Sequence, residues 1–373
     1  MGIPQEILED LSDWDLFCHF LPPGWQEKAR ESGALRRARF IPNAGVLLRV
    51  LLIHLANGCS LVETAVRARE SELAKVSAVA LWKRLQGAEE WLRWMAAEVR
   101  ATSGPPLPCM ERRVRVVDAT TVSEPGSTGT DWRVHYAVNL RDLQCDFFEL
   151  TDWSGGETWR RVPIAPGDLI VGDRVYATPS GVAHVVDGGG DVLVRLNHSS
   201  LPLFDGSGKQ FSVLGRVRGL RIGQVGQWPA YVRHPQGRWI GGRLVAVKRS
   251  RRATRLVRAR LRRRASHKQR KVSPTSWKAA AYLWVWSTLT EESPAEQILE
   301  CYRFRWQIEL VFKRLKSIMG MGHLPKKDPA SARAWLHGKL LVGLLVERII
   351  EEANAFSPWG YRLESPAKSV ERD

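Results

Sequence analysis

The chain has 373 residues, of which 44% are hydrophobic and 16 are tryptophan, and its formal net charge at pH 7 is +17. This length exceeds the size at which a single core usually stops growing, so two or three domains are expected, with ample apolar residues for their cores. The excess of positive charge favours a polyanionic partner, in particular nucleic acid, over a membrane surface.

Cysteine usage and hydropathy exclude several other classes of protein. The five cysteines, widely separated and without a CxxC pair, are Cys18, Cys59, Cys109, Cys145 and Cys301. This pattern argues against a zinc site and a disulfide framework, and it predicts reduced thiols in a cytoplasmic protein. No signal peptide is recognised, and the longest apolar stretch, residues 335–350, is interrupted by polar side chains such as Lys339 and Glu347. We expect that stretch to be a buried or partner-facing helix, not a membrane span.

Residues 1–105 are predicted to form an N-terminal helical domain. Two helical segments within it begin at serines that can act as N-caps, Ser60 and Ser77, and only a short linker joins them. This layout is typical of a DNA-binding helix-turn-helix, and it places Lys83 and Arg84 on the second helix. An ordinary helical hairpin in a bundle has the same pattern, so both interpretations stay open.

The linker SGPPLP, residues 103–108, marks a domain boundary, because the sequence becomes rich in β-formers after it. Three β-rich segments divided by turn residues predict an antiparallel meander. A loop or short helix then leads to a strand, a helix and another strand. We therefore expect an α/β fold with a sheet of mixed direction, whose first part occupies residues 106–197.

Residues 198–275 are expected to form a β-rich, basic insertion subdomain. Within it, residues 248–271 hold 13 Lys or Arg and no Asp or Glu, which leaves +4 for the rest of the chain. The sparse apolar residues Leu256, Val257 and Leu261 predict a helix that rests on a domain while its other faces stay positive. A disordered arm is the alternative. The arginines expected to make salt-sensitive phosphate contacts are Arg262, Arg263 and Arg264.

Residues 276–325 are expected to complete the core with a buried strand and a long helix. Ser293 can cap this helix, with Pro294 at its first position and Glu296 closing a capping box. At about 100° per residue, four polar side chains then share a stripe roughly 60° wide. They are Tyr302, Arg305, Glu309 and Lys316. The opposite stripe is apolar and is expected to face the core: Phe304, Ile308, Val311, Leu315 and Ile318.

The polar stripe has two interpretations: a solvated face with ion pairs, or a catalytic glutamate, Glu309, between cations that hold phosphate groups. Two aspartates favour the second interpretation. Asp118 follows the apolar run VRVV and Asp173 follows the run DLIVG, so both would stand where α/β sheets hold ligands. Each could also be an ordinary turn residue. Together, however, the three carboxylates supply the hard oxygen ligands that two Mg²⁺ ions about 3.5–4 Å apart require.

These residues resemble the signature of the DDE transposases of the insertion-sequence-four family. The family's spacing Tyr-x2-Arg-x3-Glu-x6-Lys matches at Tyr302, Arg305, Glu309 and Lys316. The strings RWQIEL and FKRLKS also resemble the family, and Asp118 in VVDATT and Asp173 in GDRVY precede them in the right order. The resemblance covers most of residues 60–350.

The resemblance implies a ribonuclease H-like catalytic core in which Asp118, Asp173 and Glu309 bind two Mg²⁺ ions, for which Mn²⁺ can substitute. It also implies a transposase that binds the terminal inverted repeats of its insertion sequence. Such an enzyme cleaves the ends by metal-dependent hydrolysis and joins the freed 3′-hydroxyl to target DNA. The protein would then be cytoplasmic in a bacterium and associated with the nucleoid.

The resemblance further implies roles in holding DNA. The residues that would hold the terminal phosphates are Tyr302, Arg305 and Lys316. Trp306, with Trp284 and Trp286 as further candidates, would stack on or displace a terminal base; a place in the core is the alternative explanation for these tryptophans. Synapsis would need at least a dimer, and the helical segment within residues 326–373 is the apolar surface expected to form it.

Two alternatives from other functional classes remain. A transposase-derived DNA-binding protein without chemistry would explain the basic features, although it would have no need for three carboxylates. A metal-dependent nuclease on the same core would use the carboxylates but would release its products without joining them.

Overall fold

The computed structural model describes residues 12–36, 40–101, 112–196 and 200–355. The predicted linker at 103–108 and Cys109 lie outside these residues. The chain divides into two compact units. The first unit comprises Met1–Pro105, Val122–Trp132 and Lys313–Asp373, and the second comprises Pro106–Thr121 and Arg133–Phe312.

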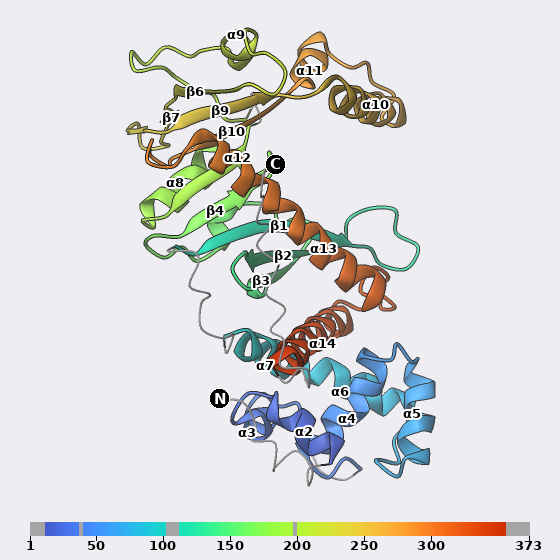
Figure 1. Ribbon diagram of the computed structural model, residues 1–373. Coiled ribbons are helices and arrows are strands. Elements are labelled where there is room, and N and C mark those ends of the chain that lie inside the picture. Colours follow the sequence, from blue (N-terminus) through green and yellow to red (C-terminus); the bar gives the residue numbers. More distant parts are fainter. Residues whose placement is uncertain (1–11, 37–39, 102–111, 197–199, 356–373) are drawn as a thin grey trace, which may run out of the picture. The chain divides into compact units, whose positions relative to one another are not determined.

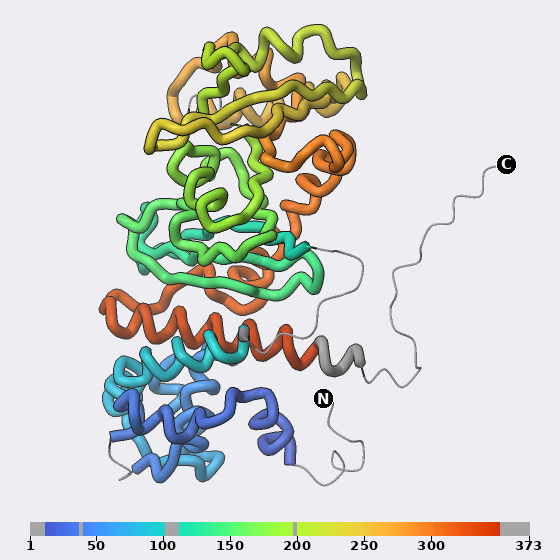
Figure 2. Tube along the Cα trace, turned by 90° about the vertical axis from the view of Figure 1, so that its left-hand side faces the viewer, coloured from blue at the N-terminus to red at the C-terminus, as the bar shows by residue number. Residues whose placement is uncertain are grey.

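The first unit is built mainly from helices. They are α2 (Asp13–His19), α3 (Trp25–Glu31), α4 (Ala44–Leu55), α5 (Leu61–Glu70), α6 (Ala78–Gly87), α7 (Glu89–Ala101) and α14 (Pro329–Ala355). The long helix α14 runs beside α7 and also contacts α4 and α6 (Figure 1; Figure 2). Leu336, Leu340 and Leu341 of α14 are buried. The apolar segment predicted at 335–350 is therefore buried within its own chain as far as Leu345, whereas Val346 and Ile350 are 40% and 55% exposed.

Helices α5 and α6 form the predicted hairpin. Ser60 Oγ accepts a hydrogen bond from the backbone N–H of Glu63 at 3.1 Å, and Ser77 Oγ accepts one from Ala80 at 3.2 Å. Both serine caps are thus confirmed, and each satisfies an amide that the helix itself leaves without a partner. On α6, Trp82 is 37% exposed and lies in the same turn as Lys83 and Arg84, the two predicted DNA contacts.

The second unit contains a mixed sheet of eight strands (Figure 1). The strands, in spatial order, are β3 (Cys145–Asp152), β2 (Trp132–Asn139), β1 (Val114–Val122), β4 (Leu169–Gly172), β5 (Asp191–Arg195), β10 (Tyr282–Ser287), β9 (Arg243–Lys248) and β6 (Val225–Pro229). Strands β1, β4 and β5 are parallel, whereas β10 is antiparallel to both β5 and β9. The predicted α/β sheet of mixed direction is confirmed.

The strands β9 and β6, which come from the predicted insertion, extend this same sheet beyond β10. A separate pair, β7 (Val232–Arg233) and β8 (Trp239–Ile240), forms a small second sheet. Among the described residues, the remaining elements of the unit are the helices α8 (Pro179–Asp187), α9 (Val213–Val217), α10 (Arg251–His267), α11 (Pro274–Ala279), α12 (Ala295–Arg303) and α13 (Gln307–Lys313), and two 3-10 turns, Trp159–Arg161 and Phe304–Trp306. The helix predicted for the basic block is α10, with Val257 and Leu261 partly buried and Leu256 exposed.

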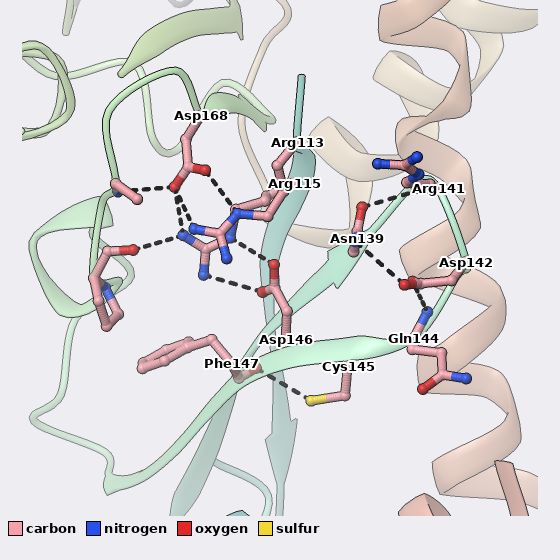
Figure 3. Close-up of polar contacts among 12 residues, drawn as sticks. Arg113, Arg115, Asn139, Arg141, Asp142, Gln144, Cys145, Asp146, Phe147 and Asp168 are labelled. Carbon is pink, nitrogen blue, oxygen red and sulfur yellow. Dashed lines mark hydrogen bonds and ion pairs between the residues drawn. The ribbon is translucent and has the colours of Figure 1, made fainter. Parts of the chain in front are cut away.

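A buried ion-pair network fixes the start of β1 (Figure 3). Arg115 on β1 is 2% exposed, and its guanidinium donates to Asp146 at 2.7 Å and to Asp168 at 3.2 Å. Arg113 also pairs with Asp168, through two hydrogen bonds of 2.7 and 2.8 Å. A buried guanidinium is tolerated only when carboxylates and carbonyls satisfy it. The network therefore constrains β1 and the loop before β4, which are the two segments that lead to the aspartates.

The predicted long helix differs from the structure in several ways. It is broken into α12, a 3-10 turn (Phe304–Trp306), α13 and a π-helical turn (Arg314–Ile318). Side-chain directions calculated with a constant turn of 100° per residue are consequently not valid over the whole segment. The N-cap of α12 is Pro294, without a side-chain hydrogen bond, so the predicted Ser293 cap is wrong. The apolar stripe is buried at its centre, whereas Phe304 and Ile318 at its ends are 43% and 78% exposed.

Candidate catalytic site

Parallel pairing of β1 with β4 brings the two aspartates together. In the register of this pair, Val117 lies opposite Gly172, so Asp118 and Asp173 follow at the same edge of the paired region. Strand β1 itself continues to Val122, so Asp118 lies within a strand and not at its end as predicted. Asp118 Oδ1 accepts a hydrogen bond from the backbone amide of Ala119 at 2.8 Å, and Asp173 Oδ1 accepts one from the backbone amide of Val175 at 2.7 Å.

Arg305 connects this pair of strands with Glu309. It lies in the 3-10 turn between α12 and α13, and its Nη1 is 3.6 Å from Asp118 Oδ2. Its Nη2 donates a short hydrogen bond to Glu309 Oε1, and these two residues are four apart on the chain. The side chain of Arg305 is 18% exposed, whereas that of Glu309 is 60% exposed. Arg305 therefore neutralises part of the charge of both carboxylates.

The electrostatic environment of Asp118 is unusual. Burial raises the pKa of Asp118 to about 7, and the negative charges of Asp173 and Glu157 contribute to this rise. The amide of Ala119 and the guanidinium of Arg305 act in the opposite direction but do not cancel it. A cation bound to this buried carboxylate would stabilise its ionised form.

A cavity of about 440 Å³ is lined by all three carboxylates together with six arginines. The arginines are Arg174, Arg195, Arg249, Arg260, Arg264 and Arg305. With twice as many guanidinium groups as carboxylates, the cavity favours a ligand with several negative charges. Arg260 and Arg264 reach it from α10, so part of the basic block faces the carboxylates.

A second cavity of about 340 Å³ shares Arg174, Arg195 and Arg249 with the first. Its wall includes Tyr282 and Trp284 of β10, whose rings stack with centroids 6.0 Å apart and planes within 9°. Burial, together with the nearby charge of Arg195, lowers the pKa of Arg249 to about 10. Such mutual repulsion between cations would be relieved by an anion between them.

The sequence did not identify Arg174, Arg195 or Arg249 as site residues. Arg174 could have been found from its place directly after Asp173. Arg195 ends β5 and Arg249 follows β9. No feature of the sequence around them distinguishes these two arginines from other cations at strand ends. They are brought together by the order of the strands in the sheet, which depends on distant segments of the chain.

The predicted tryptophans have three different environments. Trp306 is 48% exposed on the 3-10 turn, and Trp284 is buried at the second cavity. Trp286 is fully buried, and its Nε1 donates to the carbonyl oxygen of Ala230 at 3.0 Å. The structure therefore supports the core interpretation for Trp286.

The other predicted DNA contacts are distributed over both units. Tyr302 is buried on α12, where burial raises the pKa of its hydroxyl while Arg305 and Arg195 oppose the rise. Lys316 lies in the π-helical turn of the first unit. The remaining predictions are Lys83 (exposed) and Arg84 (partly buried) on α6, and Arg262, Arg263 and Arg264 (all exposed) on α10.

The carboxylates fit a divalent metal by their chemistry, because Mg²⁺ and Mn²⁺ prefer hard oxygen ligands. Among the described residues, however, no three His, Cys, Asp or Glu side chains lie close enough to hold one ion. Arg305 pairs with Glu309 and Asp118, so joint ligation by Asp118, Asp173 and Glu309 requires the pair between Arg305 and Glu309 to open. In the described part of the chain, no helix is both long and apolar enough to cross a membrane.

Comparison with known proteins agrees with this geometry. Residues 149–345 match the family described as a Transposase DDE domain. The chain is 33% identical over 344 residues to the "Putative transposase InsL for insertion sequence element IS186A" of Escherichia coli K12, covering 90% of this chain and 93% of the relative. It is also 33% identical over 345 residues to the transposase for insertion sequence element IS421 of Escherichia coli, with the same coverage.

Among solved structures, the chain resembles a piggyBac transposase synaptic complex with hairpin DNA. The TM-score is 0.51 at 8% identity, and the likeness covers 95% of this chain and 78% of that one. At this identity the likeness concerns the fold, and it agrees with the expected ribonuclease H-like core. The DDE domain implies dependence on a divalent metal ion. The match to the family and the identity to insertion-sequence transposases show that the chain belongs to the DDE transposases, an enzyme family, as its insertion-sequence-four signature predicted.

Proposed function

We propose that this protein binds the terminal inverted repeats of its insertion sequence, cleaves the element ends and joins the 3′-hydroxyl ends to target DNA. The observation that carries the proposal is the meeting of Asp118, Asp173 and Glu309 at one cavity that is otherwise rich in arginine. Carboxylates are required for metal-dependent phosphoryl transfer, and arginines offset the charge of the phosphate in the transition state.

Asp118, Asp173 and Glu309 would hold two Mg²⁺ ions, for which Mn²⁺ can substitute. When bound, these ions activate the attacking oxygen and stabilise the departing oxygen of an in-line displacement. In the first reaction a water oxygen attacks phosphorus and gives up a proton to solvent, while the bond to the 3′-oxygen of the element end breaks and that oxygen takes up a proton to become a hydroxyl. In the second, this 3′-hydroxyl gives up its proton to solvent, its oxygen attacks a target phosphodiester, and the target 3′-oxygen departs and takes up a proton.

Arg305 would exchange partners during this chemistry. It now pairs with Glu309 and lies near Asp118. If Glu309 were to ligate a cation, the guanidinium of Arg305 would be free to bind a phosphate, for which its planar fork of donors is suited. Tyr302, whose hydroxyl is influenced by the positive charges of Arg195 and Arg305, would hold the same phosphate. Lys316, in the π-helical turn, would bind a phosphate of the DNA end, as the family signature implies.

The DNA would be bound by two further surfaces. One is formed by the cavity arginines and the exposed side of α10, which would make contacts of low sequence specificity to phosphates. The other is the α5–α6 hairpin, in which the exposed Lys83 and Trp82 and the adjacent Arg84 would contact the terminal repeats. Trp306 would stack on a base near the cleavage site. We propose that the enzyme acts as a homodimer on the two element ends, in the bacterial cytoplasm and at the nucleoid.

Cleavage of labelled DNA by the full-length protein tests the proposed chemistry. The substrate carries the inverted repeats that flank the gene, and the reaction contains Mg²⁺. Asp173→Ala and Glu309→Gln should bind this DNA as the wild type does but should cut it at least a thousand-fold more slowly. Glu300→Gln, an exposed glutamate on α12, is the matched control and should cut normally. Normal cutting by either site variant would refute the assignment of the carboxylates.

A further inference from the structure

The helical segment that carries Lys316 ends in a turn that folds back onto this lysine. Gly320 has a φ of +68°, in the left-handed region where helices commonly end. The amide of Met321 donates to the carbonyl oxygen of Leu315 at 2.9 Å. The amide of Gly322 donates to the carbonyl oxygen of Lys316 at 3.3 Å, and a Cβ added to Gly322 would lie 3.4 Å from Lys316 Cβ. The conformation of this turn therefore fixes the point from which the Lys316 side chain extends.

One side of α14 faces this segment. Trp335, Lys339 and Gly343 follow one another at intervals of four residues, so they lie along one ridge of the helix. The absence of a side chain at Gly343 allows close packing, because a Cβ added there would lie 3.0 Å from Leu315 Cδ2. All of these residues belong to the first unit. The segment that carries Lys316 is therefore packed directly on α14.

Lys339 is a buried cation without a carboxylate partner. The residue is 3% exposed, and its Nζ lies 5.2 Å from the centroid of the Trp335 ring. In the described part of the chain, Lys339 forms no ion pair with an Asp or Glu side chain. Burial lowers the pKa of Lys339. A buried ammonium group needs acceptors of another kind to compensate its charge.

The end of the segment that carries Lys316 can supply these acceptors. A Cβ added to Gly320 would lie 3.7 Å from Lys339 Nζ, so the ammonium group is beside the turn that ends the segment. The last carbonyl oxygens of a helix lack partners within the helix and carry partial negative charge. A lysine at this place can donate hydrogen bonds to them and stabilise the helix end.

We propose that Lys339 is a positioning residue, whose ammonium group holds the turn at Gly320 and thereby places the side chain of Lys316 for binding a phosphate of the DNA end. This inference rests on the role proposed above for Lys316 and adds the residue that supports it. Lys339 does not itself contact DNA, because it is buried. Lys316, in contrast, is only partly buried and can reach a phosphate.

The salt dependence of DNA binding tests this role without using activity. Fluorescence anisotropy gives the binding constant K of the full-length protein, in EDTA, for labelled DNA that ends in the inverted repeat. In Lys316→Gln, the magnitude of the slope of log K against log salt concentration should fall by about 0.9, because one phosphate contact is lost. Lys339→Met should lower it by a similar amount, although its own side chain makes no phosphate contact. The double variant should show no further decrease, because both changes remove the same contact.

Two further variants show whether the charge of Lys339 is responsible. Lys339→Arg keeps a cation at the end of the helix and should keep the wild-type slope. Lys28→Met is the matched control in the same unit, because Lys28 pairs with Glu31 at 3.2 Å; it should also keep the wild-type slope. Near-ultraviolet circular dichroism establishes that each variant has the native fold, and Lys339→Gln repeats the test with a second neutral side chain.

An unchanged slope in Lys339→Met, together with a reduced slope in Lys316→Gln, would overturn the role of Lys339. Additive decreases in the double variant would also overturn it, because Lys339 would then act independently of Lys316. A failure of the proposed function gives a different result. If Lys316→Gln alone keeps the wild-type slope, the phosphate contact proposed for Lys316 is wrong, and Lys339 has no contact to support.

Discussion

The carboxylate of Asp118 is buried beside two other carboxylates, and this sets a measurable pH dependence of stability. Its pKa in the folded protein is about 7, compared with an ordinary value of 3.8. Between these values the folded state binds more protons than the unfolded state, so the free energy of unfolding falls as pH rises. The stability contributed by protonated Asp118 is present below about pH 4 and is lost as pH increases through 7.

Asp118→Asn is therefore expected to stabilise the protein at pH 8 while removing its activity. In the presence of EDTA, the asparagine avoids burying a charge and should raise the free energy of unfolding by about 1–3 kcal/mol relative to the wild type. At pH 4 the difference should nearly vanish, because Asp118 is then protonated in the wild type. Urea unfolding at both pH values measures this. A difference that is the same at both would mean that Asp118 does not titrate as described.

Asp168, by contrast, is a buried carboxylate whose negative charge is balanced by the positive charges of two arginines, Arg113 and Arg115 (Figure 3). Asp168→Asn should lower the free energy of unfolding by about 3 kcal/mol, because it leaves the buried Arg115 only partly paired. Glu291→Gln, at an exposed position, should change it by less than about 0.5 kcal/mol. Denaturant titration at pH 7 gives both values. Equal stability of Asp168→Asn and the wild type would show that the network does not support β1.

At the scale of elements, the basic helix α10 has faces with different roles. Arg258 and Arg262 lie over the ring of Trp277, each with its guanidinium carbon 4.6 Å from the ring centroid. Arg264 instead lines the cavity of the carboxylates. These cation–π contacts on one face of α10 hold the helix against α11. The arginines on its cavity-facing side are available to contact phosphates.

Replacement of Arg262, Arg263 and Arg264 by glutamine should weaken DNA binding and reduce its dependence on salt. Each phosphate contact contributes about −0.9 to the slope of log K, the logarithm of the DNA-binding constant, against log salt concentration. The magnitude of this slope should therefore be smaller by about 2 to 3 in the triple variant than in the wild type. Arg264→Gln alone should reduce DNA cleavage more than Arg263→Gln, because Arg264 lines the cavity and Arg263 does not. Fluorescence anisotropy at several salt concentrations measures the slope. An unchanged slope would exclude α10 from the DNA-binding surface.

Elements defined by local chemistry were predictable from the sequence. The Ser60 and Ser77 caps, the buried run before Asp173 and the helix of the basic block each depend on residues within one or two turns. The break at Phe304–Trp306 was not predictable, because a 3-10 turn and an α-helical turn have nearly the same sequence preferences and packing decides between them. The same limit applies to the site: the family signature identified Glu309, but Arg195 and Arg249 come to line one cavity with the aspartates only through the fold.

At the scale of the whole molecule, the two units divide the expected tasks. The second unit contains Asp118, Asp173 and Glu309 together with α10, so the residues proposed for the chemistry and the concentrated block of positive charge belong to one compact unit. The first unit contains the α5–α6 hairpin and α14. A net charge of +17 would favour salt-dependent binding of DNA with or without catalysis, so a test of the proposed function has to follow the reaction as well as the binding.

Strand joining tests the central claim most directly. Purified protein is incubated with Mg²⁺, labelled DNA that ends in a precleaved inverted repeat with a free 3′-hydroxyl, and an unlabelled target plasmid; Asp173→Ala is the control. We predict that the wild type joins the labelled end to the plasmid covalently and that Asp173→Ala binds both DNAs without joining them. Cleavage of DNA without joining would instead indicate a nuclease, and tight binding of the repeats with neither reaction would indicate a DNA-binding protein. Either result would contradict the proposal that this protein joins element ends to target DNA.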